Sequence, residues 1–364
     1  MSSNPGLGQR PLRGALLGTS PISVYHMRAW KVIPGVQIVA LANRTRSRAE
    51  AMGAEYGIAD EHIYADYREL LDHEEVDFVD IATAPAVHRE QAIAAAQHGV
   101  HILCQKPVAT SMQEAYEILA ACEAAGVRCV VNENWRWRRW YRQLKQLLDS
   151  GTIGRPLYAC VQIHDDSTLP LAEGTPPLLV REPTLPTLPQ MILFDTGIHY
   201  IDTLRFLLGD IRQVYGRVAH VSPLVRADDR GLVILDFTSG AVGIVDLSWS
   251  THVAEGKPRL VRGNLDPFVI EGDEGTIECD PYADDTIIIT TRAGTQRHPA
   301  RLGISLADAY QESYINTQSH FVQCLRTGET AENELRDNLK TLAAMFAAYE
   351  SAATNAAIVL EEKL

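Results

Sequence analysis

Apolar and polar positions alternate in blocks along the first third of the chain. Continuous apolar runs, which are typical of strands buried on both faces, occupy residues 14–18, 37–42, 76–82, 101–104 and 128–132. Segments with apolar residues at three- and four-residue spacing lie between them and predict helices over 21–31, 46–56, 87–98 and 111–125. Strands that alternate with helices through short loops predict an α/β domain with a doubly wound parallel sheet.

The pattern changes after about residue 150. A strand is predicted over 157–164 and a helix over 196–208, and the Pro-rich segment 167–190 between them is expected to form no regular element. Alternating positions then predict strands near 213–221, 231–238, 241–248, 268–272, 275–279 and 284–291, followed by helices near 307–327 and 335–354. We therefore expect a second, α+β domain with a large, mostly antiparallel sheet.

These patterns place the first domain at 13–132 and the second at 133–364, with the last helices free to pack back on the first domain. Residues 1–12, MSSNPGLGQRPL, are polar and rich in Pro and Gly, so a disordered tail is predicted there. The same residues lack the basic region and apolar run of a secretory signal peptide.

Charge and cysteine content narrow the function classes. The chain of 364 residues has 33 basic and 46 acidic side chains, and its formal charge of −13 disfavours nucleic acid and anionic membranes as partners. No apolar stretch reaches the roughly 18 residues of a membrane span. The six cysteines are widely spread without a C-x-x-C pair, which is typical of reduced thiols, so a cytoplasmic location is expected.

The turn after the first apolar run has the outline of a dinucleotide site. The stretch GALLGTSPIS at 14–23 runs from a strand into a helix, where a Rossmann domain carries G-x-G-x-x-G. Serine replaces the second and third glycines, and Ser20 followed by Pro21 is a favourable N-cap and N1 pair at a helix start that attracts phosphate. The segment is either an ordinary turn or a dinucleotide site formed by Gly18, Thr19, Ser20, Pro21 and Ile22.

The end of the second predicted strand bears on which nucleotide would bind. An acidic residue there would bind the ribose 2′-hydroxyl of NAD, but the stretch ALANRTRSRAE has Asn43, Arg44 and Arg46 at this point. A missing carboxylate beside two cations favours the 2′-phosphate of NADP over NAD as the cofactor. The alternative is a solvated helix start, although cations there oppose the helix dipole.

Three further segments carry candidate chemistry. Gln105 and Lys106 end a buried strand, at the carboxyl edge where α/β sheets bind ligands. Asp195 and His199 are four residues apart and are predicted to share one face of a helix. The stretch DIATAPAVH at 80–88 has the small residues of a loop that passes close to a cofactor, and its candidate contacts are Ala82, Thr83 and His88.

The order of these motifs resembles one family from about residue 13 to 360. A degenerate glycine turn, then Lys106-Pro107, then D-x-G-x-H at 195–199 is similar to the Gfo/Idh/MocA family of NAD(P)-dependent oxidoreductases, although its usual E-K-P reads Q-K-P here. The resemblance implies hydride transfer between nicotinamide and a hydroxyl or carbonyl of a sugar or cyclitol. Such a step needs a base and a cation at the oxygen, which implies His199 as the base, Lys106 as the cation and Asp195 as an orienting or substrate-binding group.

The stretch NENWRWRRWY at 132–141 concentrates three of the five tryptophans. Trp135 and Trp137 are predicted to stack on a sugar, the alternative being an interdomain packing helix. By resemblance, Asn134 and Arg136 match a position near the nicotinamide. Within the family the motifs are most similar to the D-apiose dehydrogenase branch, which is usually described with NAD, whereas Arg44 and Arg46 favour NADP.

Other readings stay open at this point. A regulator that binds NAD(P) without catalysis fits the altered glycine turn, and an NAD-dependent glycosidase fits the same fold. A metal site is not expected, because His199 and Asp202 are accompanied by no further ligand cluster. The resemblance implies a homodimer or homotetramer. The Pro-rich segment 167–190 is expected to form either a wall or lid of the substrate pocket or an oligomer contact.

Overall fold

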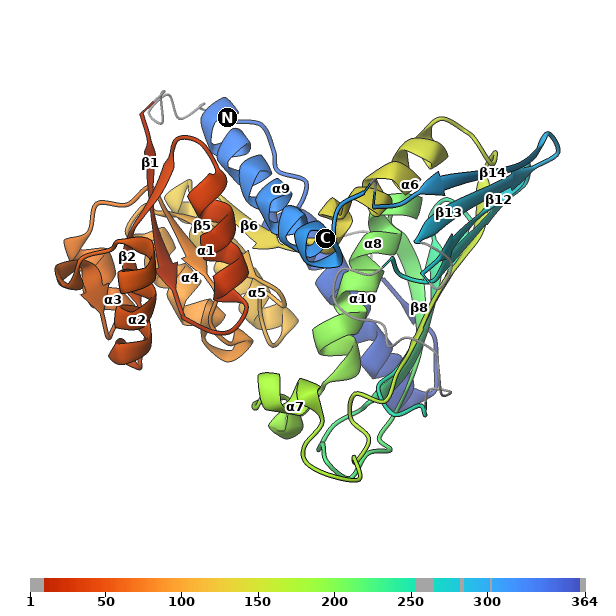
Figure 1. Ribbon diagram of the computed structural model, residues 1–364, viewed down its shortest axis with the longest axis horizontal. Coiled ribbons are helices and arrows are strands. Elements are labelled where there is room, and N and C mark those ends of the chain that lie inside the picture. The colour runs from red at the N-terminus through yellow and green to blue at the C-terminus, as the bar shows by residue number, and fades with distance from the viewer. Residues whose placement is uncertain (1–9, 253–264, 282–284, 302, 361–364) are drawn as a thin grey trace. The chain divides into compact units, whose positions relative to one another are not determined.

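A computed structural model describes residues 10–252, 265–281, 285–301 and 303–360. The chain divides into two units (Figure 1). Unit 1 is formed by Met1–Asn134 together with Gln311–Leu339, and unit 2 by Trp135–Tyr310 together with Lys340–Leu364. Each unit thus combines an early and a late segment of the chain.

Unit 1 contains the expected parallel sheet. Its strands run in the order β3-β2-β1-β4-β5-β6, and each pairing is parallel. They are β1 (Leu12–Leu17), β2 (Val36–Ala42), β3 (Ile63–Tyr64), β4 (Phe78–Ile81), β5 (His101–Gln105) and β6 (Cys129–Asn132). The strand order reverses between β1 and β4, and ligands bind at such a reversal, beyond the carboxyl ends of the strands.

Helices connect these strands and build the core of unit 1. They are α1 (Ser23–Val32), α2 (Arg46–Tyr56), α3 (Tyr67–His73), α4 (His88–Gln97) and α5 (Met112–Ala125). The later helix α9 (Leu306–Thr327) contributes Phe321, whose ring meets Phe78 edge-on at 5.4 Å, while Trp30 of α1 lies 4.9 Å from Phe78. Residues from both ends of the sequence therefore share one apolar cluster.

Unit 2 contains a nine-stranded sheet in the order β14-β13-β12-β11-β7-β10-β9-β8-β15. Only the pairing of β10 with β7 is parallel among these described strands, so the sheet is mostly antiparallel, as expected. The strands are β7 (Pro156–His164), β8 (Ile211–Ala219), β9 (Arg230–Phe237), β10 (Val242–Ser248), β11 (Phe268–Gly272), β12 (Gly275–Asp280), β13 (Thr286–Thr291), β14 (Gly294–Pro299) and β15 (Ile358–Val359).

Within unit 2, helices lie against one face of this sheet (Figure 1). They include α6 (Arg139–Asp149) and α8 (Ile198–Leu208), and α10 (Leu335–Thr354) contributes its residues from Lys340 onward. Alternate residues of β9 and β10 are buried beneath the helices, which is the pattern of a sheet with one covered face. No described helix combines the length and apolar character that a membrane crossing requires.

Two sequence-based expectations for irregular segments were wrong. The Pro-rich segment holds a helix, α7 (Pro177–Arg181), and a 3₁₀ turn at Leu185–Thr187, because proline fits the first turn of a helix, where its missing N–H would have no partner. For the tail predicted at 1–12, residues 1–9 lie outside the described residues. Arg10 pairs with Asp77 and Leu12 already belongs to β1, so the prediction extends too far.

Candidate functional site

The turn between β1 and α1 requires glycine at its first position. Gly18 has φ of +96°, in the region that favours glycine. A Cβ atom there would lie 2.7 Å from Thr83 Cγ2 and 2.9 Å from the Ala82 carbonyl oxygen. The absence of a side chain therefore lets the turn approach the loop after β4, at the reversal of strand order.

The helix start differs from the one the sequence predicts. Helix α1 begins at Ser23 with Ile22 as its N-cap, and no side chain caps it, so the N-cap assignment to Ser20 was wrong. The Ser20 hydroxyl instead donates to the Ala82 carbonyl oxygen (2.8 Å), and the Ser23 hydroxyl donates to the Ser20 carbonyl oxygen (2.6 Å). Ser20 thus ties this turn to the loop after β4, and Ser23 closes the turn on itself.

The polar residues after β2 are partly engaged within unit 1. The Asn43 side-chain oxygen accepts from the Thr19 backbone N–H (3.2 Å). Arg46 bonds Glu50 (2.8 Å) and the Asp60 carbonyl oxygen (3.1 Å), and it also donates to the Ile63 carbonyl oxygen. Arg46 is nevertheless exposed, as is Arg44, and the expectation that these two cations bind a cofactor phosphate stays a prediction.

His88 connects the loops that follow β4 and β5. Its ring is fully buried, with Nδ1 3.0 Å from the Pro107 carbonyl oxygen and Nε2 3.0 Å from the Thr83 carbonyl oxygen. Burial lowers the pKa of His88, and the hydrogen bonds to the two carbonyl oxygens oppose that shift. His88 was expected to contact the cofactor; the structure shows it buried beneath the two loops, holding them together.

Lys106 leaves the carboxyl end of β5, where the sequence places it. The preceding residue, Gln105, is 5% exposed, and its side-chain oxygen accepts from the Lys106 backbone N–H (2.9 Å). Gln105 was expected to contact the cofactor, but its buried side chain is turned toward the interior of unit 1 and supports Lys106. Lys106 itself is half-buried and so remains accessible.

In unit 2, Trp135 holds His199 in a stack of rings. The indole and imidazole rings are nearly parallel, at 8°, with centroids 4.1 Å apart, and the Arg138 guanidinium lies 3.9 Å from the indole centroid. Two groups so close to one ring cover its two faces. The expected sugar stack on Trp135 is therefore corrected: its faces meet His199 and Arg138, and the ring orients His199.

A buried carboxylate accepts hydrogen bonds from residues that contact this stack. Asp266 accepts from Arg138 (2.9 Å), from the Tyr200 hydroxyl (2.8 Å) and from the Tyr141 hydroxyl. Tyr200 in turn meets the Trp135 ring edge-on at 4.7 Å. Burial raises the pKa of Tyr200 well above its ordinary value, so its hydroxyl stays protonated and can donate.

Asp195 lies on a different kind of turn from the one predicted. Residues Leu193–Gly197 form a π-helical turn ahead of α8, and the Ile198 N–H reaches back five residues to the Leu193 carbonyl. Asp195 lies within this wider turn, whereas His199 is the second residue of α8, and their expected common face stays a prediction. Such turns often occur at functional sites, and this one carries Asp195 and leads into the helix that carries His199.

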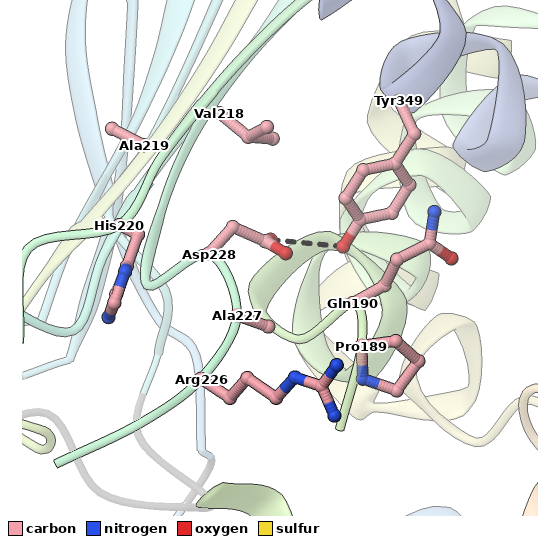
Figure 2. Close-up of a pocket in the computed structure, with 9 residues that line it drawn as sticks. All are labelled: Pro189, Gln190, Val218, Ala219, His220, Arg226, Ala227, Asp228 and Tyr349. Atoms are coloured by element: carbon pink, nitrogen blue, oxygen red, sulfur yellow. Dashed lines mark hydrogen bonds between the residues drawn. The ribbon is translucent and has the colours of Figure 1, made fainter. Parts of the chain in front are cut away.

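Asp228 and Tyr349 anchor the segment that leads into this turn (Figure 2). The Asp228 carboxylate accepts from the backbone N–H groups of Met191 and Ile192, both at 3.0 Å, and from the Tyr349 hydroxyl at 3.0 Å. Burial raises the pKa of Asp228, and these bonds oppose that rise. The two side chains border a hollow of about 360 Å³ that Pro189 and Gln190 also line.

Other residues of the Trp-rich stretch contact side chains of their own units. Arg136 forms a bidentate pair with buried Asp202, at 2.8 and 2.6 Å, which favours a structural role, and its expected nicotinamide contact stays a prediction. Asn134, in unit 1, is also buried and donates to the Ser313 hydroxyl (2.7 Å), and its expected nicotinamide contact stays a prediction. The Trp137 ring carries the Arg142 guanidinium at 3.6 Å, and its sugar contact stays a prediction.

The described residues contain no group of three or more His, Cys, Asp or Glu side chains placed to hold a metal ion. Sequence reasoning missed Asp80, Asp228 and Asp266 as organisers of the site. Asp80 had a signal, because a carboxylate inside the apolar run of β4 requires a buried partner. The partners of Asp228 and Asp266 come from distant segments and left no local signal.

Two family models together match most of the chain. Residues 12–133 match the model described as "Oxidoreductase family, NAD-binding Rossmann fold", and residues 141–278 match the GFO/IDH/MocA C-terminal domain. A D-apiose dehydrogenase of Paraburkholderia graminis is 36% identical over 93% of this chain and 87% of its own length. A second D-apiose dehydrogenase, from Rhizobium rhizogenes, is 34% identical over 94% and 95%.

A solved structure shares the whole fold. An oxidoreductase from Agrobacterium radiobacter, in complex with NAD⁺, L-tartaric acid and magnesium, superposes with a TM-score of 0.87 and 32% identity, covering 96% of this chain and 98% of that one. A myo-inositol 2-dehydrogenase of Thermotoga maritima is 25% identical over 96% of this chain. The relatives thus include dehydrogenases of both sugars and cyclitols.

Proposed function

The chain belongs to the Gfo/Idh/MocA family of NAD(P)-dependent oxidoreductases, and from this membership we propose that it oxidises a small aldose, of which D-apiose is the first candidate. It is an NAD(P)-dependent oxidoreductase of sugar- or cyclitol-type substrates. The observation that carries the finer proposal is the identity of 36% and 34% to two D-apiose dehydrogenases over most of the chain.

The cofactor fits the turn at Gly18. A Cβ atom would fill the space there, and the start of α1 presents a helix dipole that favours phosphate, so residues 18–22 are the candidates to hold the pyrophosphate. When bound, the nicotinamide accepts or donates the hydride. Ala82 and Thr83 are candidates to border it, because they form the loop that approaches Gly18.

The preference between NAD and NADP rests on few cations. Arg44 and Arg46 favour a 2′-phosphate in the sequence, but Arg46 already bonds Glu50 and two carbonyl oxygens. Both arginines are nevertheless exposed, and Asn43 stands where an acidic ribose ligand would be. We propose NAD as the preferred cofactor because the solved oxidoreductase that is 32% identical to this chain is in complex with NAD⁺, with comparison of NADH and NADPH affinity as the check.

Three side chains are proposed to act on the substrate hydroxyl. A ring nitrogen of His199 would take the hydroxyl proton, because imidazole accepts protons near neutral pH. The Lys106 ammonium would stabilise the negative charge that develops on the oxygen. Asp195 would orient the substrate hydroxyl. The Pro-rich segment would wall the substrate pocket, since Pro189 and Gln190 line a hollow beside Asp228.

A homo-oligomer is proposed from the exposed face of the second sheet. In unit 2, half-buried apolar side chains form a row across neighbouring strands on the face away from the helices, with Ile244 paired to both Ile234 and Cys160, and Cys160 to Val269. Such a row favours burial against a second copy. A cytoplasmic location is proposed because the described cysteines are free thiols.

The test is a screen of aldoses and cyclitols, D-apiose included, for reduction of NAD⁺ or NADP⁺ by the purified full chain. The proposal predicts stoichiometric formation of reduced nicotinamide with at least one aldose. Release of sugar from a glycoside without net reduction would instead support a glycosidase. Tight NADH binding with no turnover of any sugar would support a non-catalytic regulator.

A further inference from the structure

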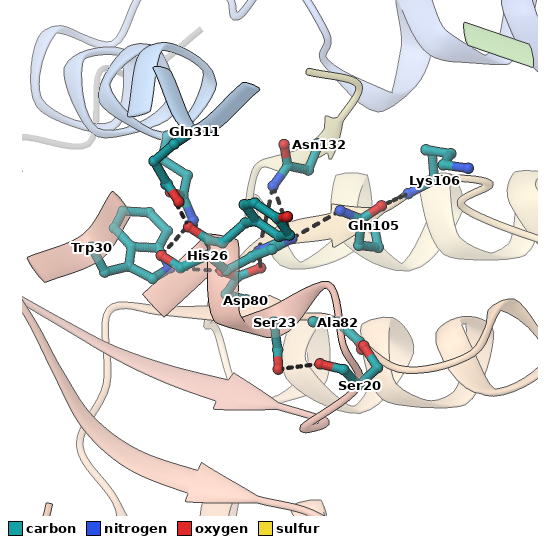
Figure 3. Close-up of polar contacts among 12 residues, drawn as sticks. Ser20, Ser23, His26, Trp30, Asp80, Ala82, Gln105, Lys106, Asn132 and Gln311 are labelled. Atoms are coloured by element: carbon teal, nitrogen blue, oxygen red, sulfur yellow. Dashed lines mark hydrogen bonds and ion pairs between the residues drawn. The ribbon is translucent and has the colours of Figure 1, made fainter. Parts of the chain in front are cut away.

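A fully buried polar cluster lies behind Lys106 in unit 1 (Figure 3). Asp80 of β4 and His26 of α1 are both 0% exposed, and His26 Nδ1 lies 2.8 Å from Asp80 Oδ2 and 3.0 Å from Oδ1. On the other side of the imidazole, Nε2 lies 2.8 Å from the side-chain nitrogen of Gln105. The Gln105 oxygen accepts from the Lys106 backbone N–H at 2.9 Å.

The Lys106 backbone N–H fixes the order of donors and acceptors from Lys106 through Gln105 and His26 to Asp80. The Lys106 backbone N–H can only donate, so the Gln105 oxygen faces it and the Gln105 NH₂ group faces His26. His26 Nε2 must then accept, which leaves its single proton on Nδ1, where the Asp80 carboxylate accepts it. If the ring carried a second proton, its Nε2–H and the Gln105 NH₂ group would be two donors that face each other without an acceptor. The cluster therefore requires neutral His26 in its Nδ1–H tautomer.

We propose that Asp80, His26 and Gln105 are positioning residues for Lys106, which fix its backbone through this one-way chain of hydrogen bonds. The inference rests on the proposed role of Lys106 in the reaction. His26 lies in α1, the helix that follows the Gly18 turn, and Asp80 lies in β4, whose end approaches that turn. One buried chain thus links α1 and β4, which flank the proposed nucleotide site, to Lys106.

The sharpest test reverses the polarity of the chain. In Asp80→Asn the amide oxygen stays where Trp30 donates, and the NH₂ group replaces the other carboxylate oxygen, 3.0 Å from Nδ1. Either the Nδ1–H then faces this NH₂ group, or the ring proton moves to Nε2 and faces the Gln105 NH₂ group, so the chain is disrupted in both tautomers. Adding Gln105→Glu supplies a carboxylate that accepts from both Nε2–H and the Lys106 N–H, at unchanged net charge. We expect Asp80→Asn to lower kcat on the order of 10-fold to 100-fold, and the double variant to recover most of it.

Trp30→Phe is the matched control. The Trp30 Nε1–H donates to the same Asp80 oxygen at 2.6 Å, and its side chain is 3% exposed, but it does not lie between Asp80 and Lys106. This variant should lose stability, as the other buried substitutions do, while kcat is unchanged. Activity is measured with NAD⁺ and D-apiose, or with the aldose of the screen that is turned over fastest.

Nitrogen NMR of the His26 ring gives a readout that needs no substrate. The wild-type full chain should show a protonated Nδ1 and an unprotonated Nε2, and the double variant should show the opposite pattern. Absence of sugar oxidation together with the expected tautomers would remove the proposed function but keep the chain of hydrogen bonds. A proton on Nε2 in the wild type, no recovery in the double variant, or an equal fall of kcat in Trp30→Phe would overturn the inference.

Discussion

The Arg136–Asp202 pair allows the most quantitative test of the structure. Asp202 is completely buried and Arg136 nearly so, at 0% and 6% side-chain exposure, and two bonds of 2.8 and 2.6 Å join them. Thr341 adds a third bond to the carboxylate, at 2.9 Å. Arg136→Met removes the guanidinium and both of its hydrogen bonds to the buried Asp202 carboxylate.

The size of the effect follows from burial. Removal of one partner from a buried ion pair costs about 3–5 kcal/mol, because the remaining charge loses its compensation. The Lys145–Asp149 pair of the same unit is a matched control, since Asp149 is 61% exposed and such surface pairs contribute no more than about 1 kcal/mol. Asp149→Asn should therefore change stability little. The double variant Arg136→Met/Asp202→Leu should recover much of the loss, because apolar side chains tolerate the site.

Urea unfolding followed by circular dichroism measures these free energies, and an NADH titration of each variant measures cofactor affinity. The structure predicts a large fall in unfolding free energy for Arg136→Met with near-native NADH affinity where the variant is folded. A loss below about 1 kcal/mol, in the range of a surface pair, together with weakened NADH binding would refute the ion-pair assignment. Arg136 would then be the nicotinamide contact that the sequence resemblance implies.

Three further predictions follow from single contacts. Gly18→Ala should lower the free energy of unfolding by about 1–3 kcal/mol through backbone strain and should also weaken NADH binding. Gly57 also has a positive φ, of +75°, but nothing lies within 4 Å of the added carbon, so Gly57→Ala should lower stability without changing NADH binding. Because burial lowers the pKa of His88 below 6.5, its contribution to stability is present above pH 6.5 and is lost as the pH falls below that value. His88→Gln should therefore reduce the fall in Tm that the wild type shows below pH 6.5. An unchanged dependence of Tm on pH in this variant would contradict the assignment. Trp135→Leu should lower kcat more than it changes KM, because the ring stack orients His199. Trp135→Phe should keep part of the activity. Equal kcat in the wild type and both variants would exclude an orienting role for Trp135.

Much of the fold follows from periodicity, and the misses follow from its absence. The buried runs that became β1, β2 and β5 are continuous and apolar because parallel strands are covered on both faces. β3 has two residues, too few to show a period. β14 is almost fully exposed and polar, so no apolar alternation marks it. Strand pairing alone defines these elements.

The site shows the same division between local and distant partners. The Gly18 turn and the positions of Lys106 and His199 follow from motifs read along the chain. The use of Ser20 does not, because its hydroxyl bonds Ala82, which is 62 residues away. Arg46 likewise bonds the Ile63 carbonyl, so a cation that appears free in the sequence is engaged in the fold. From the sequence, such side chains are assigned to a ligand because their intramolecular partners are distant along the chain.

The most direct test of the central claim is a paired measurement on Lys106→Met. Turnover of sugar with NAD⁺ and affinity for NADH are measured on the wild type and on this variant under the same conditions. The account predicts that the variant loses turnover while it binds NADH with unchanged affinity, since residues 18–22 rather than Lys106 are proposed to hold the dinucleotide. Undiminished turnover in Lys106→Met would remove this lysine from the reaction and contradict the account.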